Sequence, residues 1–430
     1  MGIKYQALKG MEDLLPGEIE KWQWLEEKAR IFFESRGFKE IRTPLLEYTE
    51  LFTRSVGEAS DIVHKEMFSF EDRGGRNVSL RPEMTASVAR AVIEHGLLKT
   101  NKSLRLYYLG PMFRAERPQA GRKRQFHQIG IEMINETDLG GFNADAEVIF
   151  RLCSFLSYVG LKGFRLRLND LGDFGEQKQV ASKLKQYFSK QKSKLCSDCH
   201  YRLDKNVLRI FDCKNESCQP VIDQAPWDEI APLSKEFKNL TSCLKASSIS
   251  FEINRRLVRG LDYYNGTVFE VAAAGLGAQD ALAGGGRYDG LYESLGGSSV
   301  PATGFSIGME RLLAALEAMG KDAFQEIQTR RVYFASLVAN SPERKLVEEQ
   351  TLRLREAGFL IETLPNEASL SAHLKRANHL GIQSVIICGE NELKESKFSL
   401  KDLEKRTQQE FDLSEMIAVL NRKVDLKHAA

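Results

Sequence analysis

The chain has 430 residues and a formal net charge of +2, with 42% hydrophobic and 28% charged residues. This composition is ordinary for a globular protein and excludes one that coats nucleic acid through its overall charge, so a polyanion would have to bind a local basic patch. The length exceeds that of one ordinary domain, and two or three domains are therefore expected.

No apolar stretch approaches the roughly 18 residues that cross a bilayer, and the N-terminus lacks the basic-then-apolar order of a secretory signal. Seven cysteines, an odd number in a long chain, argue against a disulfide framework. We therefore expect a cytoplasmic protein that has no membrane partner.

The first hundred residues predict two helices with an extended segment between them. Apolar residues at helical spacing predict a helix over residues 18–36. Residues 38–48 should be extended, because Pro44 does not fit a helix interior. A second helix is expected over residues 80–96, with Pro82 at its first position and Glu83 in its first turn.

Residues 104–113 and 126–134 alternate in the manner of antiparallel strands. In the second strand one face carries His127, Ile129, Ile131 and Met133, and the other carries Phe126, Gln128, Gly130 and Glu132. Solvent would be the ordinary neighbour of the second face. Gly130 weakens a strand, however, and suggests that something approaches the backbone closely. His127 shares the apolar face and is expected to pack rather than to act as a base.

The segment between these strands is strongly basic. It contains Arg114, Arg117, Arg122, Lys123 and Arg124, with Pro118 and Gly121 marking a turn among them. Few acidic residues accompany them, which raises the question of what negative group lies at the mouth of the hairpin.

The pattern changes over residues 176–245, which are lysine-rich and helical at first and then rich in cysteine. Strand signals return over residues 249–269, so we interpret residues 173–247 as an insertion within a larger sheet domain. The insertion contains Cys196 and Cys199 as C-x2-C, and Cys213 and Cys218 as C-x4-C. This spacing is typical of structural zinc. It fits equally a variable segment whose free thiols pack harmlessly in a reducing compartment.

From residue 330 onward strands and helices alternate, which predicts a small α/β domain with a largely parallel sheet. The break near residues 320–330 is the expected boundary, giving domains over residues 1–325 and 329–430.

Five ordered segments combine glycine, arginine and acidic residues. They are GFKEIRTPLLE at 37–47, FRAERPQAGRKRQFHQIGIE at 113–132, LVRGLDYYNGTVFE at 257–270, AGGGRYDGL at 283–291 and GFSIGMERLL at 304–313. Each alone has a plain structural explanation. The triplet 284–286 fits a flexible turn, Arg259 fits a buried ion pair, and Arg311 fits a residue that is solvated or paired with a nearby carboxylate. Together they resemble the motifs of class II aminoacyl-tRNA synthetases and, within that class, the histidyl-tRNA synthetase family.

The first, second and fifth segments resemble motifs 1, 2 and 3 of the class, and the other two resemble segments peculiar to the histidine family. The resemblance spans almost the whole chain and matches the insertion only loosely. It implies an α+β catalytic domain built on an antiparallel sheet flanked by helices, with an inserted helical, cysteine-bearing subdomain. It also implies a small C-terminal α/β domain that binds the anticodon.

The resemblance implies a reaction in two steps. Histidine attacks the α-phosphate of ATP, which enters with Mg²⁺, to give histidyl-adenylate; the histidyl group then passes to the 3′ end of tRNA(His). The family does not generally need zinc for catalysis, so the resemblance gives no support to zinc at the cysteines. Motif 1 lies at a two-fold interface in this class, so a homodimer is implied.

Site residues follow from the same resemblance. Arg114 and Arg259 match the catalytic arginines at the α-phosphate, where a guanidinium meets two oxygens at once. The residues matched to histidine binding are Glu83, Met84, Thr85, Arg114, Gln128, Glu132, Arg259, Tyr263 and Tyr264. ATP would be bound by Arg114, Glu116, Phe126 and Arg311, and the tRNA acceptor end by Arg117, Gln119 and Arg122.

Some alternatives stay open at the level of sequence. Glu132 could be a solvated strand residue, and either of Tyr263 and Tyr264 could simply pack in the core. In the C-terminal domain Lys375 and Arg376, beside His373 and His379, could face phosphates or solvent. A non-catalytic paralogue that regulates histidine biosynthesis, or senses histidine or uncharged tRNA, is the competing function. Regulatory paralogues usually lack the C-terminal domain and the motif arginines, which this chain has.

Overall fold

A computed structural model describes residues 5–57, 60, 62–118, 121–136, 144–276, 280–320, 324, 327, 330–338, 341–364 and 368–425. The chain divides into two units, Met1–Met319 and Gly320–Ala430. Among the described residues, no helix is long and apolar enough to cross a membrane.

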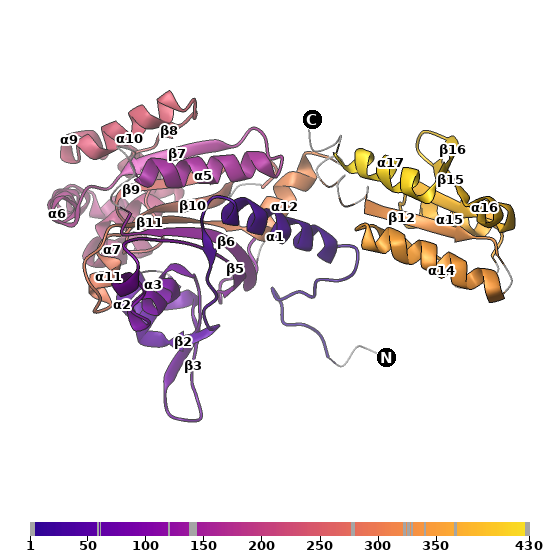
Figure 1. The fold of residues 1–430 in the computed structure, drawn as a ribbon. Helices are drawn as coiled ribbons and strands as arrows, with labels where there is room; N and C mark the ends of the chain where they lie inside the picture. The colour runs from indigo at the N-terminus through magenta and orange to yellow at the C-terminus, as the bar shows by residue number, and fades with distance from the viewer. Residues whose placement is uncertain are drawn as a thin grey trace. The chain divides into compact units, whose positions relative to one another are not determined.

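The first unit is built on an eight-stranded sheet in the order β1-β5-β6-β11-β10-β9-β7-β8 (Figure 1). Its strands are β1 (Lys39–Glu40), β5 (Leu104–Phe113), β6 (Gln125–Ile134), β7 (Arg165–Asp170), β8 (Glu252–Ile253), β9 (Asn265–Ala272), β10 (Ala281–Arg287) and β11 (Ala302–Gly308). The six central strands are antiparallel, and only the two-residue edge strands run parallel to their neighbours. The antiparallel sheet expected from the sequence is therefore confirmed.

One face of this sheet packs on helices through aromatic side chains. Helices α1 (Ile19–Glu34), α5 (Ala144–Tyr158) and α12 (Met309–Ala318) lie along it (Figure 1). The ring of Phe33 on α1 lies 5.1 Å from Phe155 on α5, 5.8 Å from Tyr107 and 6.3 Å from Phe305, between ring centroids. His127 shares this face, with its ring centroid 4.9 Å from that of Trp22 and its Nδ1 3.2 Å from Glu310 Oε1, so the prediction that it packs is confirmed.

The opposite face carries α2 (Thr49–Val56) and α3 (Thr85–Glu94), together with a three-stranded sheet of β2 (Leu46–Tyr48), β4 (Asn77–Leu80) and β3 (Phe68–Glu71). The helix predicted to start at Pro82 in fact begins at Thr85. The reason is that the carboxylate of Glu83 accepts hydrogen bonds from the backbone N–H groups of Thr85 and Ala86, at 2.7 and 2.9 Å. The side chain of Glu83 therefore caps the N-terminus of α3 and is not itself part of the helix.

Between β7 and β8 the described chain is entirely helical or irregular. The segments are α6 (Phe174–Lys190), η2 (Lys192–Lys194), α7 (Ser197–Lys205), η3 (Val207–Asp212), η4 (Glu216–Cys218), α8 (Gln219–Asp223), α9 (Trp227–Ile230) and α10 (Lys235–Ala246). Asp173 and Glu176 form a capping box at the start of α6. The strand signals over residues 249–269 were partly wrong, because residues 254–264 form a loop between β8 and β9.

The second unit has a five-stranded sheet in the order β13-β12-β14-β15-β16. Its elements are β12 (Arg331–Ser336), α14 (Ser341–Glu356), β13 (Leu360–Glu362), α15 (Leu370–His379), β14 (Ser384–Cys388), α16 (Glu390–Glu395), β15 (Lys397–Asp402), β16 (Thr407–Asp412) and α17 (Leu413–Asp425). The three parallel strands agree with the sequence prediction, which did not include the β15–β16 hairpin. His373 is fully buried and bonded to Tyr333 Oη and Ser336 O, so it does not face phosphates.

We predict that Gly130→Ala destabilises the first unit by about 1–3 kcal/mol, the usual cost of overpacking. A Cβ there would lie 2.3 Å from the hydroxyl of Tyr108 and 2.6 Å from the carbonyl oxygen of Phe305, and the carbonyl belongs to the neighbouring strand. Thermal unfolding of the two proteins measures the difference. Gly260→Ala is the control, since its nearest neighbour would be 3.6 Å away, and equal melting temperatures for both variants would contradict the prediction.

Candidate active site

The floor of the candidate site is a row of residues that lie directly opposite one another on five neighbouring strands. From β5 to β9 the row reads Tyr108, Gly130, Ser306, Gly284 and Glu270. A Cβ on Gly284 would lie 2.2 Å from Nη2 of Arg259, just as one on Gly130 would meet Tyr108. The two glycines therefore leave room for Tyr108 and Arg259 to lie over bare backbone.

Arg259 reaches this row from the loop between β8 and β9. Its Nη1 donates to Glu270 Oε2 at 3.2 Å, which ties the guanidinium to the sheet. Its Nε is buried and has no hydrogen-bond partner among the described residues. A buried donor without a partner is costly, so the site suits an anionic or carbonyl-bearing ligand that accepts this bond.

Two carboxylates are buried side by side at another part of the same face. Glu132 is 1% exposed and accepts from Thr85 Oγ1 at 2.7 Å and from the hydroxyl of Tyr288. Glu83 is 3% exposed and, besides the two N–H groups of α3, accepts from Tyr263 Oη at 3.3 Å. The sequence had left open a solvated Glu132, and that alternative is wrong.

Burial dominates the electrostatics of both carboxyl groups. It raises the pKa of Glu83, and it raises the pKa of Glu132 to about 8 although hydrogen bonds from Tyr288 and Thr85 act in the opposite direction. The nearby Glu83 adds to the rise of the pKa of Glu132. Both groups are therefore poised to ionise when a ligand brings a positive charge or N–H donors into the pocket.

Arginines lie on the β5–β6 side of the site. Arg114 Nε donates to the carbonyl oxygen of Pro82 at 3.1 Å, next to Glu83, and its guanidinium carbon lies 5.1 Å from the ring centroid of Phe126. Burial lowers the pKa of Arg114, which still leaves a guanidinium charged at neutral pH. Arg311, on α12, donates from Nη1 to the carbonyl oxygen of Gly121 at 3.1 Å and so faces the hairpin loop.

The hairpin loop itself holds Glu116 and Arg122 together, with 3.2 Å between Oε2 and Nη1. Arg117 and Arg122 are exposed. Gln119, which the sequence assigned to the same loop, lies outside the described residues. Met84 is buried, and its sulfur accepts from Thr43 Oγ1 at 3.2 Å, so its side chain packs beneath the site.

Tyr263 and Tyr264 are both buried, with ring centroids 4.7 Å apart, and they pack with Tyr288 at 5.7 and 6.5 Å. Gln128 donates from Nε2 to Ser306 Oγ at 3.3 Å, while its Oε1 is buried without a partner among the described residues. The tyrosines thus form one wall, and Gln128 offers an acceptor.

Sequence reasoning missed four residues that shape the site: Tyr108, Glu270, Tyr288 and Ser306. The last three stand inside segments that the sequence singled out. Only the strand register of Glu270 and Ser306, and the hydrogen bond from Tyr288 to Glu132, show that they face the site. Tyr108 had one indirect signal, since Gly130 on the neighbouring strand suggested that something approaches the backbone closely.

Comparisons with known proteins match this architecture over nearly the whole chain. The family model described as Histidyl-tRNA synthetase matches residues 10–312, and that described as Anticodon binding domain matches residues 335–423. The chain belongs to the histidyl-tRNA synthetase family.

A histidine–tRNA ligase of Prochlorococcus marinus (strain MIT 9211) is 45% identical over 405 residues, 93% of this chain and 93% of that protein. One of Thermotoga maritima is 42% identical over 413 residues, 95% of this chain and 96% of that protein. The crystal structure of apo S. aureus histidyl-tRNA synthetase has a TM-score of 0.71 and 29% identity, covering 97% of this chain and 99% of that one. This member of the family is therefore an aminoacyl-tRNA synthetase.

In this synthetase the raised pKa of Glu132 gives a testable pH dependence. The pKa of Glu132 is about 8 in the folded protein, against 4.5 for an ordinary glutamate. The protonated carboxyl group therefore contributes fully to the free energy of unfolding below about pH 4.5, and this contribution is lost as the pH rises towards 8. Glu132→Gln has no group that ionises at this position, so its stability lacks this pH dependence, and the amide is close in shape to the protonated carboxyl group. Without ligand, the stability of the variant relative to wild type should rise between pH 5 and pH 8 by roughly 1 kcal/mol per pH unit. Melting temperatures across this range measure it, and a difference independent of pH would refute the assignment.

Proposed function

We propose that this pocket activates L-histidine with ATP to form histidyl-adenylate and then transfers the histidyl group to the 3′ end of tRNA(His). The protein is thus an aminoacyl-tRNA ligase of protein biosynthesis, and we place it in the cytoplasm. The observation that carries the proposal is one sheet face that combines half-buried arginines with two buried carboxyl groups whose pKa values are raised by burial.

The carboxylates suit the two basic ends of histidine. Glu132 faces the imidazole N–H, and Glu83 with Thr85 receives the α-amino group, so each ligand group stabilises an ionised carboxylate. Gln128, Tyr263 and Tyr264 complete the pocket, and Met84 supports it from below. An amino acid with an apolar side chain would leave the Glu132 carboxylate unpaired. Polar recognition of this kind discriminates against such amino acids by roughly 10⁴-fold or more.

The arginines suit the triphosphate. Arg114 and Arg259 hold the α-phosphate and the carboxylate of histidine, supplying fixed positive charge to an in-line displacement. Arg311 acts near the far phosphates and the adenine, which stacks on Phe126 beside Glu116. Glu116 would have to give up its ion pair with Arg122 to contact the adenine. Mg²⁺ enters with ATP, and zinc takes no part in this scheme.

The tRNA meets both domains. The exposed Arg117 and Arg122 in the hairpin loop, together with Gln119, contact the acceptor end. We assign residues 1–325 to the catalytic domain, with the insertion at about 173–247, and residues 329–430 to anticodon binding. In the latter domain Lys375 and Arg376 are exposed on α15 and suit phosphates.

ATP–pyrophosphate exchange with each of the twenty amino acids, followed by charging of total tRNA, tests this function. We expect exchange with histidine alone and histidyl-tRNA as the product. A non-catalytic paralogue, or a sensor of histidine or uncharged tRNA, would bind its ligand without exchange, and that result would refute the proposal.

Within the same assay, Arg114→Ala and Arg259→Ala should each reduce exchange by at least 10²-fold, the usual scale for losing one fixed electrostatic group. Arg105→Ala is the matched control, since Arg105 lies on β5, which ends one residue before Arg114, but pairs with Glu136 at 2.9 Å. Exchange at the wild-type rate in both pocket variants would remove the proposed roles.

We also propose a homodimer formed through the segment that resembles motif 1. Leu45 and Leu46 in this segment and Tyr48 just after it are large apolar residues that are 43%, 45% and 59% exposed. Three such residues within one short stretch suit a protein interface.

Sedimentation at micromolar concentration should therefore give about twice the chain mass of 48.6 kDa. Leu46→Lys should shift the distribution towards monomer, because a charge would be buried without a partner. Leu360→Lys, at a residue 53% exposed in the second unit, should leave it unchanged. A wild-type monomer would contradict the proposal.

A further inference from the structure

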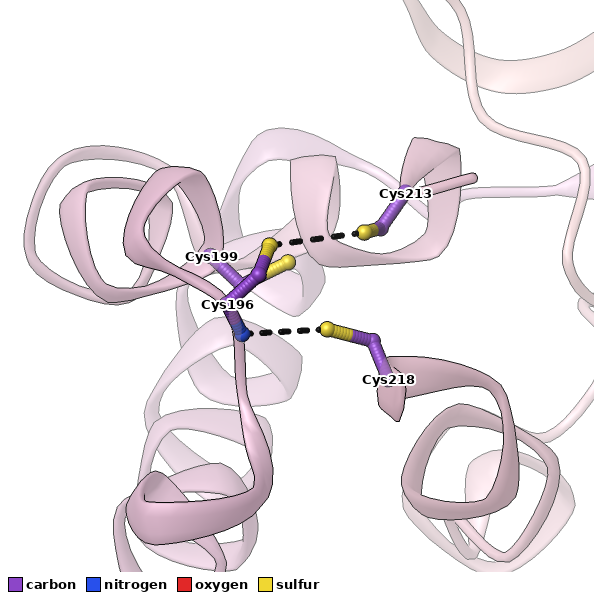
Figure 2. Close-up of side chains that lie close together, drawn as sticks. All are labelled: Cys196, Cys199, Cys213 and Cys218. Carbon is purple, nitrogen blue, oxygen red and sulfur yellow. Dashed lines mark hydrogen bonds between the residues drawn. The ribbon is translucent and has the colours of Figure 1, made fainter. Parts of the chain in front are cut away.

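Four cysteine sulfurs converge within the insertion between β7 and β8. Cys196 immediately precedes α7, Cys199 lies in its first turn, Cys213 follows η3 and Cys218 ends η4. Figure 2 shows their side chains pointing toward one common point. All four sulfur atoms lie within 4.8 Å of one another. The first cysteine pair lies 14 to 22 residues before the second in the sequence, and short helices rather than one loop bring the two pairs together.

These dimensions fit one tetrahedral metal ion. A zinc ion with four sulfurs at 2.3 Å has sulfur–sulfur edges of about 3.8 Å. The sulfurs of Cys196 and Cys213 are already 3.8 Å apart, so the widest pair has to close only about 1 Å to complete such a tetrahedron. All four cysteines are free rather than joined in disulfides.

Two of the four sulfurs accept hydrogen bonds from backbone N–H groups. The backbone N–H of Cys196 donates to Cys218 Sγ at 3.2 Å, and that of Asn215 donates to Cys213 Sγ at 3.4 Å. Such donors orient metal-bound sulfur and offset its negative charge. Cys199, Cys213 and Cys218 are buried while Cys196 is partly exposed, which leaves an entry path for an ion.

We infer that Cys196, Cys199, Cys213 and Cys218 bind one structural zinc ion. Four sulfurs and no open position make a closed site that has no catalytic role. An iron–sulfur cluster would place its inorganic core between the same ligands and hold them farther apart. Hard cations such as Mg²⁺ prefer oxygen ligands. The ion joins α7, η3 and η4, which are too short to be stable alone.

Metal analysis of the full chain, purified without chelators, tests this inference. We expect about one zinc ion per chain, with X-ray absorption giving four sulfur neighbours at about 2.3 Å. Cys199→Ser and Cys213→Ser should abolish near-stoichiometric zinc, whereas Cys243→Ser, in α10 of the same insertion but outside the cluster, should retain it.

Titration of the wild-type protein with an organomercurial keeps the test independent of whether a variant folds. Zinc should be released in step with modification of four thiols, as detected by a colorimetric zinc chelator. Less than about 0.2 zinc per chain, zinc that persists in Cys213→Ser, or iron in its place would overturn the inference. None of these measurements depends on histidine activation, so the metal site and the proposed function stand or fall separately.

Discussion

The pocket depends on two carboxylates that are buried next to each other and that, among the described residues, bond to no positively charged side chain. Glu83 and Glu132 receive hydrogen bonds only from hydroxyl and backbone N–H groups in the described structure. Burying charge in this way is costly, and the raised pKa of each group reflects that cost. A positively charged group placed beside these carboxyl groups would therefore favour their ionisation.

Space for these groups comes from glycines in the central strands. At Gly304 a Cβ would lie 1.9 Å from Glu132 Oε2 and 2.4 Å from the carbonyl oxygen of Ile131. In the same way, the missing side chains of Gly130 and Gly284 leave room for Tyr108 and Arg259. The antiparallel register places Gly130 and Gly284 on either side of Ser306 and Gly304 opposite Glu132, so part of the pocket floor is bare backbone.

The sequence predicted what depends on local pattern. The strands at 104–113 and 126–134 were confirmed because alternation over nine or ten residues is a strong signal, and the resemblance to the synthetase family named residues that the fold brings to one face. It failed at one helix start, in one loop and in one exposed strand. The start of α3 was wrong because Glu83 caps it, the loop at 254–264 was taken for strand, and the hairpin strand β16 is too polar and exposed to show a pattern. The pairing of Arg259 with Glu270 likewise exists only through the register of β9.

The loop that carries Arg259 and Tyr263 is also held from the insertion. Asp262 Oδ1 accepts from Asn206 Nδ2 at 3.0 Å and from Arg209 Nη2 at 3.0 Å, and both donors lie within or next to η3. Asp262 also donates its backbone N–H to the carbonyl oxygen of Val56, at the end of α2. The insertion thus braces the loop that carries Arg259, so changes in the insertion can displace this arginine without contacting the pocket itself.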